Sequence, residues 1–180
     1  MFLPNQPRIA SFRAEYAKQA DFCDVFKNDT KPLYLLAFFL TANHKESEQC
    51  FISTVADAFK ERAVFKEWAR SWVKRRLIEN AIEIVSPASD RSSPRRDVWS
   101  TEQRWTRRSY EIDTVTKLAN FERFVFVISI LERYSKLNCS LLLGCSTDKI
   151  VQARVRAFRQ LTGPAALFAP TRAAAQGEMK

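Results

Sequence analysis

Glycine and histidine are scarce in this sequence, which has three glycines and one histidine among 180 residues. So few glycines, with few turn clusters before residue 86, favour an all-α chain. The cysteines form no C-x-x-C pair, and a zinc site would need closer ligand spacing with His44, so we expect no metal or other cofactor. We expect all four thiols to be small apolar groups inside helices or turns: Cys23, Cys50, Cys139 and Cys145.

Catalytic patterns are missing as well. The sequence has no glycine-rich loop that could cradle phosphates and no paired carboxylates in a plausible pocket. With a single histidine in addition, we predict that the protein is not an enzyme.

Long apolar runs are also missing. The longest runs, residues 33–40 and 124–131, are far shorter than the roughly 20 residues that span a bilayer. The start MFLPNQPRIA lacks the charged region and apolar core of a signal peptide. We therefore expect a cytoplasmic protein that has no membrane partner.

Basic residues are in clear excess. The net charge is +9 and the isoelectric point is near 9.7, so an acidic partner such as nucleic acid is expected. A hydrophobic content of 46% argues against a wholly disordered basic protein.

The hydrophobic pattern predicts two small helical domains, residues 8–85 and 118–161. The Pro-, Ser- and Arg-rich stretch 86–117 is predicted to be a linker, although Trp99, Trp105 and Tyr110 do not fit a bland spacer. Residues 162–180 are predicted to be a flexible tail. In the first domain, helices are expected over about 8–26, 32–40, 46–59 and 64–84.

The second domain is predicted to contain three helices. The first covers about 118–133, the second follows Ser135 and ends at Gly144, and the third begins at Ser146 or Thr147. An alternative for the first is a buried strand, because FVFVISIL is rich in β-branched and aromatic residues. A stretch of about sixteen residues without glycine or proline favours the helix.

Two short helices around a glycine turn, the second of them basic, are typical of a helix-turn-helix. The small Ser140 would let the two helices cross closely. Cations on the last helix can neutralise phosphates, and Gln152 can hydrogen-bond a base edge. The DNA contacts predicted on this helix are Thr147, Lys149, Gln152, Arg154, Arg156 and Arg159.

Two tryptophans in the first domain allow two interpretations. Trp68 and Trp72 would share one helix face, where they could stack unpaired bases or belong to the core. We favour the core for Trp68 and leave Trp72 open. The DNA contacts predicted in this domain are Arg70, Trp72, Lys74, Arg75 and Arg76, with a merely solvated face as the rival interpretation.

Short motifs in residues 121–161 match a known pattern of the form S-x-x-E-I-A-x-x-L-G-C followed by T-V-x-S-R-L-x-R-A-x-x-x-L. The chain supplies Ser135, Leu143-Gly144-Cys145, Ile150, Arg156-Ala157 and Leu161 in register. It departs at Asn138 and at Ala153-Arg154. The region resembles domain four of bacterial RNA polymerase sigma factors of the extracytoplasmic-function class.

The first domain resembles domain two of the same family, through residues 22–41, 47–59 and 65–79. Both resemblances occur in the order of the family. The main departures are Gln49, Ile52 and Ser53, which replace the acidic and amide residues that face the polymerase clamp in the family. Residues 81–84 also replace a basic run.

The resemblance implies a sigma factor or sigma-like regulator that binds promoter DNA and directs core RNA polymerase to initiate transcription. It implies promoter DNA, the polymerase core and an anti-sigma factor as candidate partners, with polymerase contacts at Gln49, Ile52 and Ser53. The alternatives are a degenerate sigma-like protein-interaction module and a stand-alone helix-turn-helix regulator.

Overall fold

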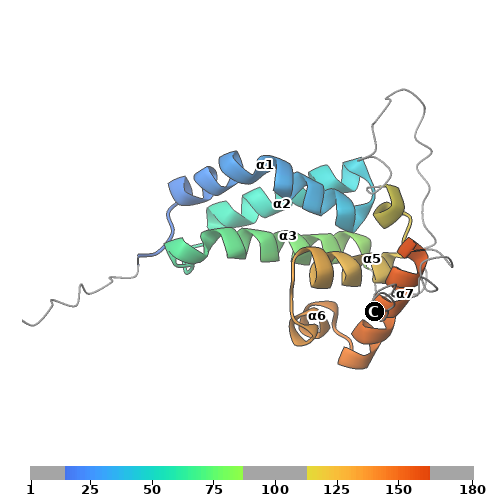
Figure 1. Ribbon diagram of the computed structural model, residues 1–180. Coiled ribbons are helices and arrows are strands. Elements are labelled where there is room, and N and C mark those ends of the chain that lie inside the picture. Colours follow the sequence, from blue (N-terminus) through green and yellow to red (C-terminus); the bar gives the residue numbers. More distant parts are fainter. Residues whose placement is uncertain (1–14, 87–112, 163–180) are drawn as a thin grey trace, which may run out of the picture.

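A computed structural model of the protein describes residues 15–86 and 113–162 (Figure 1). Its regular structure there is helical, apart from one isolated antiparallel bridge between Tyr16 and Phe65, so the all-α prediction is confirmed for these residues. The tail, most of the predicted linker, and Trp99, Trp105 and Tyr110 lie outside them. None of the helices in the described ranges combines the length and apolar character that a membrane crossing requires.

Three long helices form a bundle, and each contacts the other two (Figure 1). They are α1 (Gln19–Thr41), α2 (His44–Lys60) and α3 (Ala69–Val85), with the short turn η1 (Lys66–Trp68) leading into α3. Their facing sides are apolar and buried, as helical periodicity predicted. The largest fully buried side chains of the bundle include Phe22, Leu33, Leu40, Val73, Leu77 and Ile78.

Helix α1 corrects one prediction about the bundle. We expected separate helices on either side of the polar residues 27–30, but α1 runs through them and bends at Asp29, where φ is −112° and ψ is 17°. Pro32 follows the bend, at the start of the second straight part. Proline is tolerated there because its missing N–H falls where the regular hydrogen bonding is already interrupted.

The second part of the chain starts with a short helical segment at residues 113–116, followed by α5 (Asn120–Phe126). The helix continues without a break into a π-helical turn, η2 (Val127–Leu131), in which the Glu132 N–H donates to the Val127 carbonyl at 3.0 Å. This stretch contains the FVFVISIL run. The buried-strand alternative is therefore wrong, and the run is helical.

Two further helices, α6 (Lys136–Leu143) and α7 (Thr147–Thr162), complete the described part. The Ser135 hydroxyl accepts from the Asn138 N–H at 3.1 Å, and Gly144 closes α6 at φ 60°. The Ser146 hydroxyl accepts from the Lys149 N–H at 3.4 Å. The local start and stop signals were thus predicted correctly, because each needs only one or two neighbouring backbone groups.

The two parts, which we predicted to be two small helical domains, contribute to one hydrophobic core. α5 and η2 pack against α1, and α5 lies between the bundle and the α6–α7 pair (Figure 1). Packing also begins earlier than the predicted boundary at residue 118, since Val115 is buried together with Leu118. The apolar run 124–128, which spans the end of α5 and the start of η2, explains the shared core, because all of its residues are buried.

A buried arginine links α5 to the C-terminal end of α1. Arg123 of α5 is 2% exposed and donates from Nε to the Leu40 carbonyl at 3.2 Å and from Nη2 to the Thr41 carbonyl at 3.4 Å. The remaining donors reach the Leu118 carbonyl at 3.2 Å and Asn120 Oδ1 at 2.9 Å. Burial lowers the pKa of Arg123 to about 10, so the group stays charged at neutral pH.

This contact places a cation at the C-terminal end of α1, whose last turn contains no basic residue of its own. The carbonyl groups that end a helix carry partial negative charge and need donors. A second link joins α3 to the end of η2, where Lys74 Nζ lies 2.8 Å from Glu132 Oε2. The orientation of α5 is therefore tied to two helices of the bundle.

We predict that Arg123→Ala lowers the free energy of unfolding by about 3 kcal/mol, because it leaves buried carbonyl groups of α1 without donors. Chemical denaturation measures this. The control is Lys27→Ala, which removes an exposed cation from α1. Equal losses in the two variants would contradict a structural role for Arg123.

Candidate nucleic-acid interface

The last helix, α7, turns one narrow face to the core. Ile150, Ala153 and Ala157 are fully buried against its neighbours α5 and α6. The two alanines allow close approach of the helices, because they add little volume between the axes. With about 100° of rotation per residue, this buried face fixes which side chains point away from the protein.

The outward face of α7 has a central strip of four side chains. Asp148 and Val155 lie nearly opposite the buried face, and Val151 and Gln152 flank them on either side. All four are exposed. Two of the four are apolar, a feature that the sequence analysis missed because it considered only the polar and basic residues of this helix.

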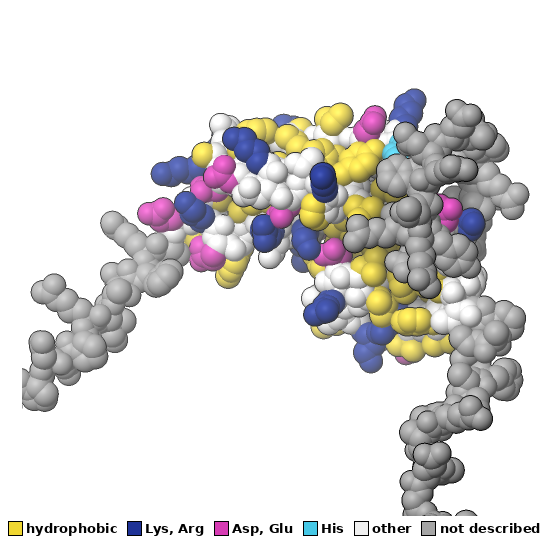
Figure 2. Space-filling view, turned by 45° about the horizontal axis from the view of Figure 1, so that its top comes forward, with side chains coloured by type: hydrophobic (Ala, Val, Ile, Leu, Met, Phe, Trp, Pro, Cys, Tyr) yellow, Lys and Arg dark blue, Asp and Glu magenta, His cyan; other side chains and the backbone are white. Residues whose placement is uncertain are grey.

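Cations border this central strip on both sides. Lys149 and Arg156 lie along one border and the half-buried Arg154 along the other, Thr147 lies at the start of the helix, and Arg159 continues the outward strip one turn beyond Val155. In the space-filling view, the lower part of the molecule formed by α6 and α7 shows basic and apolar side chains next to one another (Figure 2). The six predicted contacts on α7 therefore lie around its exposed side, with Gln152 and Arg159 on the outward face itself.

One of these cations has an internal partner. Arg156 Nε lies 2.7 Å from Glu122 Oε1, so it connects α7 to α5 and its charge is partly balanced. By contrast, no ion pair within residues 15–86 and 113–162 engages Lys149, Arg154 or Arg159. These three cations are the ones whose charge is available to an anionic partner.

The predicted DNA-contacting cations on α3 differ from Lys149, Arg154 and Arg159, because each of them pairs with an acidic side chain. The guanidinium of Arg70 donates to Asp29 Oδ1 at 2.9 Å, next to the bend in α1. Lys74 forms the ion pair with Glu132 that ties α3 to the end of η2. Arg75 lies 3.0 Å from Glu79, and Arg76 lies 2.8 Å from Asp57. Internally neutralised cations contribute little to a basic surface, so α3 is a poorer candidate than α7.

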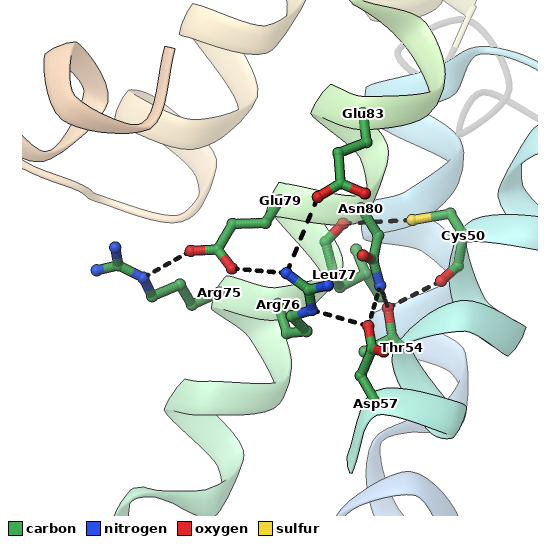
Figure 3. Close-up of polar contacts among 9 residues, drawn as sticks. All are labelled: Cys50, Thr54, Asp57, Arg75, Arg76, Leu77, Glu79, Asn80 and Glu83. Carbon is green, nitrogen blue, oxygen red and sulfur yellow. Dashed lines mark hydrogen bonds and ion pairs between the residues drawn. The ribbon is translucent and has the colours of Figure 1, made fainter. Parts of the chain in front are cut away.

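Arg76 belongs to a polar network between α2 and α3 (Figure 3). Asp57 Oδ2 accepts from Arg76 Nε at 2.8 Å and from Asn80 Nδ2 at 3.1 Å, and the same amide donates to Thr54 Oγ1 at 3.1 Å. The Thr54 hydroxyl donates to the Cys50 carbonyl at 2.8 Å. Because the buried Thr54 and Asn80 and the half-buried Asp57 and Arg76 satisfy one another, the network fixes the register of the two helices.

The two tryptophans do not form a common platform. Trp68 is 60% exposed and lies in η1, edge-on to Phe65 at 5.5 Å, so the expectation that it belongs to the core is wrong. Trp72 is half-buried and packs edge-on against Phe22, also at 5.5 Å. The difference arises because α3 starts at Ala69 rather than near Val64, which places Trp68 in the preceding turn.

The predicted polymerase contacts lie on the solvent side of α2, whose buried residues are Ser47, Cys50, Thr54 and Ala58. Gln49 is exposed, Ile52 is 66% exposed and Ser53 is half-buried. An isoleucine at this exposure is free to make an apolar contact with another protein.

No group of three or more His, Cys, Asp or Glu side chains in the part of the chain that the structure describes could hold a metal ion. No known protein-family model matches the sequence, and neither does any curated protein. The arrangement of side chains is therefore the basis of the functional argument that follows.

The Asp57 carboxylate should make stability depend on pH. Burial alone would raise its pKa, but hydrogen bonds from Arg76 and Asn80 outweigh this and hold the pKa below the ordinary 3.8. A lowered folded-state pKa stabilises the protein above the ordinary value, and the contribution is lost as pH falls through the folded-state pKa. We therefore expect the unfolding free energy to fall less steeply below about pH 4 in Asp57→Asn than in the wild type.

The measurement is urea denaturation at a series of pH values from neutral to strongly acidic. Asp24→Asn, which changes an exposed carboxylate of α1, is the matched control and should keep the wild-type slope. If the slopes of Asp57→Asn and wild type coincide, the carboxylate does not stabilise the fold through its charge.

Proposed function

We propose that the protein is a sigma-like transcription regulator that binds double-stranded DNA, with α6 and α7 acting as a helix-turn-helix and α7 as the recognition helix. The observation that carries the proposal is the layout of α7. From Asp148 to Val155 its central strip carries one charge, that of Asp148, cations lie along both borders, and the cation Arg159 continues the strip one turn further on. A helix in the major groove needs this layout, because the groove floor presents bases and both walls present phosphates.

The dimensions and the ends of the helices support the proposal. A helix with its side chains is about 10–12 Å across, which matches a major groove about 12 Å wide. The N-terminal residues of a recognition helix contact the base edges. In α7 these residues include Asp148, which can accept from a cytosine amino group, and Gln152, which can pair with adenine.

Contact with the core polymerase is the finer part of the proposal. It is supported by the exposed side of α2 that carries Gln49 and Ile52, and by the order in which the two sigma-like regions occur. An anti-sigma factor would be a further partner of such a protein. A stand-alone regulator would bind DNA through α7 but would not use this side of α2.

A protein-interaction module that does not bind DNA is the second candidate function. The observation that favours it is the internal pairing of every predicted cation on α3, which leaves the bundle without a free basic stripe. This candidate predicts binding through α2 and no salt-dependent affinity for duplex DNA.

Lys149→Ala and Arg159→Ala should each weaken DNA binding, because each removes a cation that has no internal partner. Each should also reduce the slope of log affinity against log salt concentration by about one, the value for one lost phosphate contact. Fluorescence anisotropy with a labelled duplex at several salt concentrations measures both quantities.

Lys27→Ala is the control for the change in net charge, since Lys27 lies on α1. It should leave the salt slope unchanged. Identical slopes in the wild type and in both α7 variants would mean that α7 does not contact phosphates, and the proposed mode of DNA binding would be wrong.

Ile52→Ala should weaken binding to purified core polymerase by about tenfold, as expected for the loss of a well-packed apolar contact at an interface. Its DNA affinity should not change. Leu35→Ala, which truncates an exposed apolar residue of α1, is the matched control. If the isoleucine variant binds the core as tightly as the wild type does, this side of α2 is not the polymerase contact.

A further inference from the structure

Two exposed valines lie on the face of α7 that points away from the protein. Val151 is 42% exposed and Val155 is 44% exposed, although the helix has its own buried apolar side. More than half of each valine is covered by its neighbours, and the rest is open to a partner. A β-branched side chain lowers helix propensity, so the helix by itself does not favour valine at these positions.

The valines lie between the two cationic borders, with Arg154 beyond Val151 on one side. Four residues apart, they are neighbours on one side of the central strip, about 6 Å apart along the axis. Lys149 and Arg156 border the opposite side of the strip, beyond Gln152. Cations on the borders would hold the two phosphate walls of the groove, so the valines would meet the base edges on its floor.

An apolar side chain can recognise one group on that floor. The C5-methyl group of thymine is the apolar group that a base pair presents in the major groove, whereas the other base atoms there are hydrogen-bond donors or acceptors. Valine has no hydrogen-bonding atom. Gln152 adjoins the valines and can form two hydrogen bonds with adenine, so the three side chains together suit adjacent A·T pairs.

A protein partner is a weaker explanation for the same valines. The apolar strip is short and ends at Phe158, which is 42% exposed and packs edge-on against Phe126 at 5.8 Å. A stable protein interface covers about 800 Å² on each partner, far more than the exposed parts of the two valines and Phe158 offer. The flanking cations Lys149, Arg154 and Arg159 also favour a polyanion over an apolar protein surface.

We propose that Val151 and Val155 determine DNA sequence preference by contacting thymine methyl groups, next to an adenine that Gln152 reads. The inference rests on the proposed function and deepens it, since it names the base pairs that this helix prefers. Since the valines are about 6 Å apart and base pairs about 3.4 Å apart, the two thymines lie within about two base-pair steps.

The test starts with duplexes selected by the full-length protein from a pool with a randomised central segment. In the best duplex, each thymine is replaced in turn by deoxyuridine, which removes the methyl group and keeps the base pairing. We expect about fourfold weaker binding of the wild type at one or two positions, the effect of one buried methyl group. The selected duplexes should share A·T pairs at those positions.

Variants then assign each methyl group to a valine. Val151→Ala and Val155→Ala should each weaken binding to the thymine duplex by a similar factor. Each should also lose the sensitivity to deoxyuridine at one position and keep it at the other. Leu35→Ala on α1 is the control for an exposed apolar truncation and should keep the full wild-type pattern.

Three results would overturn the inference. Salt-dependent binding with no effect of deoxyuridine at any position would refute the reading of methyl groups and leave DNA binding by α7 intact. Weaker binding of the valine variants to thymine and deoxyuridine duplexes alike would mean that the valines act on helix position only. No enriched duplex, together with no salt-dependent binding, would refute both the inference and the proposed function.

Discussion

The contact between Arg123 and the end of α1 is the constraint on which the rest of the structure depends. The guanidinium supplies donors to the Leu40 and Thr41 carbonyls, which the helix itself leaves without partners. It comes from α5, so α5 can satisfy α1 only in one position. The position of α5 in turn determines where η2 ends, and hence where α6 and α7 begin. An interaction at the centre of the molecule thereby sets the orientation of the candidate DNA-binding face.

The distribution of paired and unpaired cations divides the basic residues into two groups. Each predicted cation of α3 forms an ion pair with an acidic side chain. Arg70 pairs with Asp29 of α1 and Arg76 with Asp57 of α2. Lys74 pairs with Glu132 at the end of η2, and Arg75 with Glu79 of α3 itself. On α7, the described acidic side chains leave Lys149, Arg154 and Arg159 without an ion pair. Ion pairs at partly exposed sites add little stability but they cancel the local field, so of the two helices with predicted DNA contacts α7 keeps more of its positive potential.

The buried side of α7 and its outward side have complementary roles. Ala153 and Ala157 bring the helix close to its neighbours, and Arg156 adds an ion pair to Glu122. This fixes the rotation of the helix about its axis. A fixed rotation matters for a recognition helix, because a turn of one residue would replace a base-reading side chain by a phosphate-binding one. Rigid presentation of a mixed face of valines, an amide and cations is what sequence-selective recognition requires.

Local signals in the sequence by themselves determined the helical class, both ends of α6 and the start of α7. Ser135, Gly144 and Ser146 act on backbone groups within three or four residues, so their effect can be read without the fold. Tertiary structure alone decided that α1 bends without ending, that Trp68 is exposed and that the two parts share one core. It also chose the partners of Arg123 and of the α3 cations. The bonds from Arg123 to α1, and the pairs that Arg70, Lys74 and Arg76 form outside α3, join residues 19 to 83 positions apart. Local spacing carries no information about which distant carbonyl or carboxylate comes within reach.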